Sequence, residues 1–261
     1  MSDHAEPGAV PGIIFGTNAV GEALRAQGRV NRLYLAKDAK VREKQALVDL
    51  ARTQGIPYDF VPLARLNELA GSRDHQGVLA RISPVAYTEL DAFLASCPPQ
   101  ATVLALDGVQ HPKNLGMLIR TAVGAGCHAL ILAARGGALL DESVVRASAG
   151  ALFHLPVIMT TKFPDTLRQL QEAGFWVYGM DPAGRESVFT VSWAERCVVV
   201  MGNETKGMRG PARKCCDALV RIPLAQELDS LNVAVAAGIA LFQVMAARTT
   251  AAPRPVSRNT S

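Results

Sequence analysis

Residues 196–210 read RCVVVMGNETKGMRG, and this stretch decides the fold class. Its first half is an apolar run rich in valine, which is typical of a strand buried on both faces of a parallel sheet. The run passes directly into Gly202, Glu204 and Gly207, where glycine permits a tight turn and close approach of a ligand to main-chain N–H groups. A buried strand that ends in such a loop predicts an open α/β sheet with a ligand site at the carboxyl ends of its strands.

Two further segments repeat this arrangement of an apolar run beside polar residues. They read LDGVQHPKNLGMLIRTA (106–122) and RIPLAQELDSLNVAVAAGIALF (221–242). Each polar residue taken alone fits a structural cap or turn. Three such segments at one sheet edge favour a binding site, because open α/β sheets bind ligands at that edge. The polar residues that we single out in these two segments are Asn114, Arg120, Ser230 and Asn232.

Strand-like and helix-like patterns alternate along most of the chain, which predicts an α/β fold. We expect a small α/β unit over 12–82 and a second unit, with a mostly parallel sheet, over 101–248. Three prolines mark 83–100 as a linker. The polar, proline-containing stretch 249–261 predicts a disordered tail. The expected helices cover 18–26, 40–53, 63–70, 114–125, 143–153, 165–173 and 231–248.

The composition indicates a folded and nearly neutral protein. Of 261 residues, 49% are hydrophobic and 19% are charged, which excludes a disordered, collagen-like or coiled-coil chain. The formal net charge of +4 permits a local phosphate-binding patch but does not by itself indicate nucleic acid. Five cysteines without metal-ligand spacing predict neither a zinc site nor a disulfide framework. The first 11 residues lack the pattern of a targeting signal, so we expect a cytoplasmic protein. Because the cysteines lack metal-ligand spacing, we also expect no resident metal.

One uncharged run and one glycine motif invite other interpretations. The run 230–247 is rich in alanine, and we interpret it as a buried helix rather than a membrane span. GAGCHA (124–129) matches a dinucleotide-binding fingerprint. Here, however, a predicted helix ends in the glycines and a strand follows, which reverses the order that the fingerprint requires. The sequence therefore does not predict a nicotinamide enzyme.

The three segments resemble the motifs of the SpoU/TrmH family of RNA ribose 2′-O-methyltransferases, which belong to the knotted SPOUT superfamily. The first motif matches Asn114 and Arg120 followed by GCHALIL (126–132). MGNETKGM (201–208) matches the second motif and IPLAQELDSLNVAVA (222–236) the third, in the family's order. The resemblance implies a C-terminal α/β-knot domain with a trefoil knot and a mostly parallel sheet.

The resemblance implies an enzyme that transfers a methyl group from S-adenosylmethionine to a ribose 2′-hydroxyl of RNA, most directly a guanosine of large-subunit rRNA. It assigns cofactor contacts to Gly202, Ile222 and Leu231. It makes Arg120 the catalytic arginine, acting as a base or as a partner of the target phosphate. A guanidinium group keeps its proton at neutral pH, so we favour the phosphate role. The other residues with implied catalytic roles are Asn114, Glu204, Ser230 and Asn232.

The first unit resembles the substrate-binding domain that family rRNA methyltransferases carry ahead of the catalytic domain. The similarity lies in IIFGTNAVGEAL (13–24) and RDHQGVLARI (73–82). It makes His75 and Gln76 candidate RNA contacts, although a polar turn that enters a strand explains them equally well. The role of Glu204 also has two interpretations, because a carboxylate at that position fits either a contact with the substrate or a brace between loops.

The resemblance also implies a homodimer whose RNA surface uses both subunits. The Ala-rich last helix, in which Gly238 allows close approach, is the expected dimer face. Two other functions stay open. One is a tRNA ribose methyltransferase of the same superfamily, and the other is a non-catalytic RNA-binding or ribosome-associated protein that retains the fold. The presence of all five candidate catalytic residues argues against the second of these.

Overall fold

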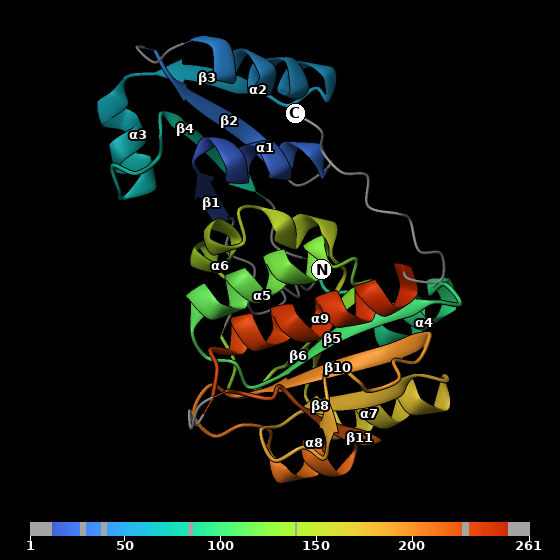
Figure 1. Ribbon diagram of the computed structural model, residues 1–261. Coiled ribbons are helices and arrows are strands. Elements are labelled where there is room, and N and C mark those ends of the chain that lie inside the picture. Colours follow the sequence, from blue (N-terminus) through green and yellow to red (C-terminus); the bar gives the residue numbers. More distant parts are fainter. Residues whose placement is uncertain are drawn as a thin grey trace, which may run out of the picture.

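The chain folds around two β-sheets, one above the other in Figure 1. The computed structural model describes residues 12–26, 30–37, 41–82, 86–138, 140–225 and 230–249. The expected tail is outside these residues, apart from Thr249 at the end of the last helix. No helix in these ranges is long and apolar enough to cross a bilayer.

The first sheet has four strands in the order β1-β4-β2-β3. Its β2–β3 pair is parallel, and the pairs that involve β4 are antiparallel. Two of its three helices pack on one face and α3 covers part of the other. The elements are β1 (Gly12–Phe15), α1 (Thr17–Arg25), β2 (Val30–Ala36), α2 (Val41–Thr53), β3 (Tyr58–Val61), α3 (Leu63–Ala70) and β4 (Val78–Ile82).

The second sheet has seven strands in the order β7-β6-β5-β10-β8-β11-β9, and every pairing is parallel. This confirms the expected α/β class with a mostly parallel sheet. The elements are α4 (Leu90–Ser96), β5 (Ala101–Asp107), α5 (Pro112–Gly124), β6 (Ala129–Ala133), α6 (Glu142–Ala147), the 3₁₀ helix η1 (Ala151–His154), β7 (Val157–Thr160), α7 (Phe163–Glu172), β8 (Trp176–Met180), β9 (Glu186–Ser187), β10 (Arg196–Gly202), α8 (Gly210–Lys214), β11 (Ala218–Arg221) and α9 (Val233–Thr249).

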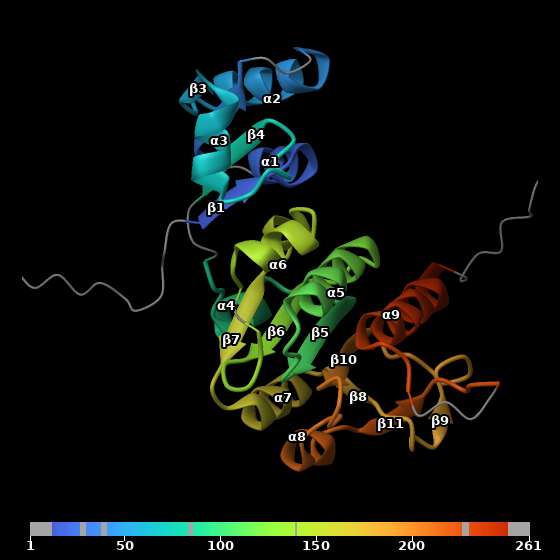
Figure 2. The ribbon, with the colours of Figure 1, turned by 90° about the vertical axis from the view of Figure 1, so that its left-hand side faces the viewer.

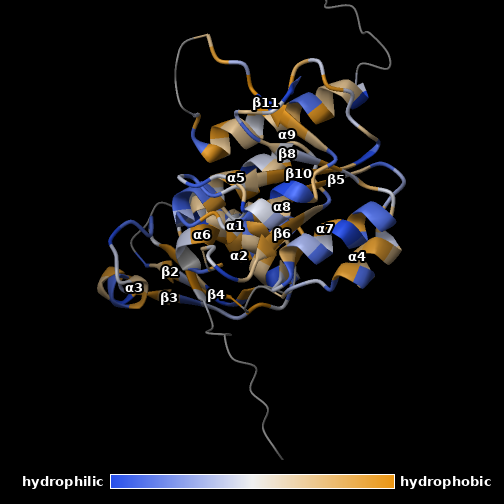
Figure 3. Cartoon of the chain, turned by 90° about the horizontal axis from the view of Figure 1, so that it is seen from below, coloured by the Kyte–Doolittle hydropathy of each residue, from blue (hydrophilic) through white to orange (hydrophobic). Residues whose placement is uncertain are grey.

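Helices cover both faces of the parallel sheet, which explains its continuous apolar strands. Successive residues of β5 alternate between two cores. Leu104 and Leu106 pack on the side of α5 and α9, and Val103 and Ala105 pack on the side of α4 and α7. Figure 3 shows apolar strands in the middle and hydrophilic residues on the outer helices α7 and α8.

The predicted helix over 143–153 is wrong in one respect, because it breaks after Ala147. Ala149 and Gly150 both adopt positive φ angles, 51° and 83°, and the chain then continues as η1. The positive φ at Gly150 favours glycine, and the position is also close to the other unit: a Cβ on Gly150 would lie 2.5 Å from Cβ of Glu22. The strand β1, the short elements β9 and α8, and α4 within the expected linker were not predicted.

The two units touch through α1 and β1 on one side and α6 and η1 on the other, as Figure 2 shows. Nε2 of His154 lies 2.8 Å from a carboxylate oxygen of Glu22. The Arg146 guanidinium lies over the Phe15 ring, 4.7 Å from its centroid. Helix α6 is in turn packed tightly on α5, since a Cβ on Gly116 would lie 2.3 Å from Cβ of Ala147. The interface between the units is therefore connected directly to the helix of the first motif.

Candidate active site

Glu204 joins two loops at the carboxyl ends of β5 and β10. These strands pair side by side and end together, with Gly202 opposite Asp107. The Glu204 carboxylate accepts hydrogen bonds from the main-chain N–H groups of Gln110 and His111, both at 3.1 Å. It also accepts one from Nδ2 of Asn114 at 3.1 Å. The structure thus brings together two of the predicted site residues, which lie 90 positions apart in the sequence.

Asn232 extends this network to the third segment. Its Nδ2 donates to Oδ1 of Asn114 at 3.1 Å, so the Asn114 amide donates to Glu204 and accepts from Asn232. Oδ1 of Asn232 accepts from the N–H of Ala234 at 2.9 Å, which is the cap of α9. Asn232 therefore caps α9 and also joins the third segment to the other two.

The hydrogen bonds to Glu204 favour its ionised form. Partial burial acts in the opposite direction and raises the pKa of the carboxyl group. The bonds from Asn114, His111 and Gln110 outweigh it and hold the pKa of Glu204 below its ordinary value. Glu204 is therefore a carboxylate near neutral pH, and its role within the chain is to brace the first loop against the second.

A second set of contacts, which the sequence did not predict, holds the same loops. Asp107 is 1% exposed and accepts hydrogen bonds from the main-chain N–H and from the guanidinium of Arg209. Nδ2 of Asn203 donates to the carbonyl of Gly108 at 2.9 Å. The one available signal was the acidic residue at the end of an otherwise apolar strand, because a buried carboxylate needs a partner.

Gly202 is required by the path of its own loop. A Cβ on Gly202 would lie 2.2 Å from main-chain atoms of Gly207 and Met208. The loop closes through paired hydrogen bonds between Asn203 and Gly207, both 3.0 Å. A side chain at position 202 would force this turn away from the strand end.

Arg120 and Ser230 lie apart from the network. Both are exposed, and Arg120 makes no hydrogen bond or ion pair within the described part of the chain. Six residues at 3.6 per turn place Arg120 about 120° around the helix from Asn114. The structure therefore groups Asn114, Glu204 and Asn232, and Arg120 lies outside this group with no partner among the described residues.

Two main-chain N–H groups at the predicted cofactor site have no hydrogen-bond partner among the residues that the structure describes. Ile222 follows β11 and Leu231 precedes α9, and both side chains are half-buried. Neither main-chain N–H donates a hydrogen bond among the described residues. Unpaired N–H groups beside half-buried apolar side chains fit the polar edge and the faces of a purine ring.

The candidate RNA contacts of the first unit are engaged within the fold. His75 is 2% exposed; its Nε2 lies 2.8 Å from Oδ1 of Asn67, and its Nδ1 accepts from the N–H of Gly77. Oε1 of Gln76 accepts from the N–H of Thr17 at the start of α1. This geometry favours the polar-turn interpretation of both residues, and an RNA contact of either one stays a prediction. Gln76 is exposed.

No group of three or more His, Cys, Asp or Glu side chains suited to a metal ion occurs within the described ranges. The site is built from amides, one carboxylate, main-chain groups and an exposed arginine.

Known proteins match this chain over nearly its whole length. Residues 101–242 match the SpoU rRNA methylase family, and residues 13–88 match the RNA 2′-O ribose methyltransferase substrate-binding family. A putative TrmH family tRNA/rRNA methyltransferase, YacO of Bacillus subtilis, is 34% identical over 88% of this chain and 94% of its own. The 23S rRNA (guanosine-2′-O-)-methyltransferase RlmB of Xanthomonas axonopodis pv. citri is 34% identical over 90% and 96%.

A solved structure shares the fold. The AdoMet-bound rRNA methyltransferase of Sinorhizobium meliloti superposes with a TM-score of 0.75 at 28% identity, covering 92% of this chain and 88% of that one. The family match over the seven-stranded unit and the curated relatives agree with the motifs that meet at Glu204. The chain belongs to the SpoU family of RNA methyltransferases.

Proposed function

We propose that this protein methylates a ribose 2′-hydroxyl of RNA, with S-adenosylmethionine as donor and a guanosine of large-subunit rRNA as target. The observation that carries the proposal is the Glu204–Asn114–Asn232 network, which joins three strand-end segments at one edge of the sheet. The similarity to RlmB, named as a 23S rRNA guanosine methyltransferase, supports the choice of substrate.

The cofactor binds, in this proposal, beside Gly202, Ile222 and Leu231. The unpaired N–H groups of Ile222 and Leu231 recognise the adenine edge, and their side chains contact its faces. The Sinorhizobium meliloti neighbour, which is bound to AdoMet, supports this assignment. When bound, S-adenosylmethionine supplies an electrophilic methyl group. The chain's own part is to fix the direction from which the ribose approaches.

Arg120 grips the phosphate next to the target ribose through its planar fork of N–H donors. Its exposure and its lack of a partner within the described residues leave the fork available. Asn114 and Asn232 position the ribose, Glu204 holds Asn114, and Ser230 supports Arg120. Arg120 is kept out of the proton-transfer step, because a guanidinium group is a very weak base.

We further propose a homodimer formed through α9. This helix leaves Val235, Phe242 and Met245 exposed, at 52%, 44% and 39%. Exposed apolar side chains that repeat along one helix mark a contact surface. Light scattering is expected to give twice the chain mass, and Phe242→Glu is expected to give the single mass. A stable monomer of the unaltered chain at working concentration argues against the dimer. The trefoil knot, the domain limits and the cytoplasmic location stay predictions.

The decisive experiment measures transfer of labelled methyl from S-adenosylmethionine to total rRNA and, separately, to total tRNA. We expect label in rRNA, at a ribose 2′ position located by mapping, and no label with Arg120→Ala. Label confined to tRNA would favour the tRNA methyltransferase. Cofactor and RNA binding without transfer to either RNA, or to ribosome assembly intermediates, would favour a non-catalytic RNA-binding protein.

A further inference from the structure

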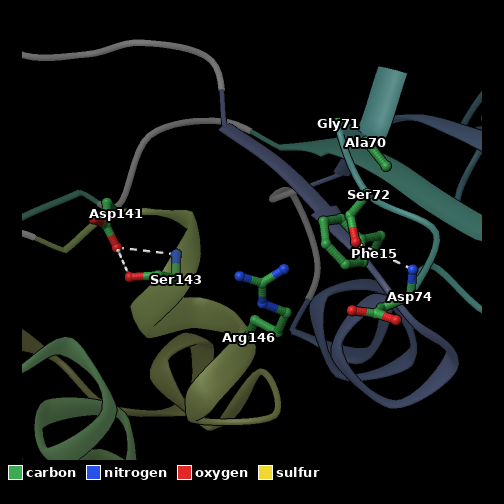
Figure 4. Close-up of a pocket in the computed structure, with 8 residues that line it drawn as sticks. All are labelled: Phe15, Ala70, Gly71, Ser72, Asp74, Asp141, Ser143 and Arg146. Carbon is green, nitrogen blue, oxygen red and sulfur yellow. Dashed lines mark hydrogen bonds between the residues drawn. The ribbon is translucent and has the colours of Figure 1, made fainter. Parts of the chain in front are cut away.

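A groove of about 580 Å³ lies between the two units, away from the Glu204 network. One wall comes from the end of β1 and from the end of α3 with the turn that follows it, and the other comes from α6 and the residue that caps it (Figure 4). Its lining includes polar and charged side chains that are not part of the Glu204 network. The lining residues are Phe15, Ala70, Gly71, Ser72, Asp74, Asp141, Ser143 and Arg146.

Arg146 provides a fixed cation with free donors on one wall. Its guanidinium is held over the Phe15 ring at 4.7 Å, and the ring itself is 3% exposed. The guanidinium makes no hydrogen bond or ion pair with any described residue. The cation–π contact holds the guanidinium beside the ring, and its N–H donors are unused among the described residues.

Asp74 provides the free acceptor on the other wall. Its carboxylate has no hydrogen bond or ion pair in the described chain, while its main-chain N–H donates to Oγ of Ser72 at 3.1 Å. The second carboxylate, Asp141, is committed to the start of α6, where one oxygen accepts from the N–H groups of Ser143 and Val144. Asp74 and Arg146 face the same hollow and form no ion pair with each other, so a ligand has room between them.

The donor and acceptor pattern selects the ligand. A bare phosphate fits poorly, because the unpaired Asp74 carboxylate repels it. Guanine presents O6 and N7 acceptors that a planar guanidinium reads bidentately. On its Watson–Crick edge it presents N1–H and N2–H donors, which suit a carboxylate, whereas adenine has a donor in place of O6 and lacks the N2 donor. Cytosine offers acceptors at O2 and N3 but donors on N4 alone, so guanine is the base that offers a two-atom pair to each wall.

We propose that the groove binds an unpaired guanine of the RNA substrate, away from the nucleotide that is methylated. The proposal rests on the proposed function for its substrate class. The match of residues 13–88 to a substrate-binding family places one wall of the groove in a unit of the right kind. The close contact of Gly116 with Ala147 ties α6 to α5, so a base held here is fixed relative to the helix of Asn114 and Arg120.

The first measurement uses the full chain and labelled uridine hexanucleotides that carry one guanosine, adenosine or cytidine near the middle. Fluorescence anisotropy gives the four dissociation constants, with hexauridylate as the fourth RNA. We expect the guanosine RNA to bind about tenfold more tightly than the others, the size of discrimination that one bidentate contact gives. Equal affinities for the four RNAs overturn the proposal.

Two variants test the two walls. Asp74→Asn and Arg146→Lys are each expected to remove most of the guanosine preference while leaving adenosine RNA nearly unchanged, and thermal melting checks that both fold. The matched controls are Asp165→Asn and Arg168→Lys, an exposed ion pair on α7. They are expected to keep the preference. If Arg146→Lys weakens the binding of all four RNAs equally, Arg146 binds phosphate, and the proposal that it recognises a base is wrong.

A failure of the guanine-binding proposal can be distinguished from a failure of the proposed function. Methyl transfer is measured in parallel, with Arg120→Ala. Guanosine preference without any methyl transfer contradicts the enzyme and supports the groove. Transfer to rRNA without a guanosine preference supports the enzyme and contradicts the groove.

Discussion

The two ends of the β5–β10 strand pair are held by opposite chemistry. At the carboxyl ends, the Glu204 carboxylate accepts from the main-chain N–H groups of Gln110 and His111. At the amino ends, the Arg248 guanidinium donates to the main-chain carbonyls of Ala101 and Glu195, at 3.1 and 2.7 Å. The anion thus meets main-chain donors at one end, and the cation meets main-chain acceptors at the other.

The difference between the ends lies in their surroundings. Around Arg248 three partners are buried, since Thr102 is 2% exposed and Ala101 and Cys197 are fully buried, while Glu195 is exposed. Around Glu204 the loops are half-buried or exposed, and Asn232 and Arg120 lie on the surface. A packed end contributes stability, whereas an open end gives a ligand access. We therefore expect changes at one end to alter unfolding and changes at the other to alter methyl transfer.

Glu204→Ala should have the largest effect. It frees the first loop and leaves Asn114 without its acceptor, so the rate of methyl transfer is expected to fall about 100-fold or more, the loss typical of misplaced catalytic groups. Steady-state assays with rRNA measure it. The midpoint of thermal unfolding should change little; a large drop in that midpoint with unchanged activity would reverse the assignment of the two ends.

Arg120→Lys comes next, because it separates charge from geometry at the open end. Lysine keeps the cation but loses the planar fork, and a drop of about tenfold in kcat/KM is expected from the loss of one bidentate contact. The affinity for the cofactor, measured by calorimetry, should stay the same. Activity near that of the unaltered protein contradicts the phosphate-gripping geometry.

Arg248→Met should lower the free energy of unfolding by about 2 kcal/mol, because it strips donors from buried carbonyl and hydroxyl acceptors. Denaturant titration measures the change. At temperatures where the variant stays folded, its rate of methyl transfer should lie within twofold of normal. The exposed Arg168→Met serves as control, since surface pairs of that kind contribute little.

Acidification should affect the two ends in different pH ranges. Burial, and then the nearby Arg248, lower the pKa of His128, whose Nδ1 accepts from the N–H of Thr102. Neutral His128 therefore contributes to the stability of the folded protein, because the unfolded chain protonates this imidazole more readily. This contribution is complete above about pH 6.5 and declines as the pH falls below that value. Unfolding measured from pH 8 to 5 should show the decline in the unaltered protein. If His128 is the cause, the decline in stability should be absent from the His128→Gln variant.

The smallest effect is expected from Glu204 in the same titration. Its pKa is held below the ordinary value, so its contribution is complete above about pH 4.3 and is lost as the pH falls through the folded-state pKa. The stability difference between the unaltered protein and Glu204→Gln should therefore stay constant from pH 8 to 5. A difference that changes in this range indicates another titrating group at the open end.

The sequence predicted the parallel sheet because apolar runs and loop residues are local signals. It also predicted that Asn114, Glu204 and Asn232 would meet, since the ends of parallel strands share one edge. It did not predict the Arg209–Asp107 contact, because nothing local joins residues 102 positions apart. It also missed the break at Gly150, where the main chain lies close to Glu22 of the other unit. The helix position of Arg120 follows from spacing alone, yet its exposure needed the tertiary structure.

Helix α9 reaches both ends of the strand pair, with Asn232 just before its first turn and Arg248 in its last. These contacts join residues 118 and 146 positions apart, so neither can form until α9 itself has been synthesised. Contacts of such long sequence separation make folding slow, because the chain loses loop entropy before it gains the contact. A nascent chain that stops before α9 would thus expose the apolar face of β5 and β10. The step most open to aggregation or chaperone capture therefore precedes the synthesis of α9.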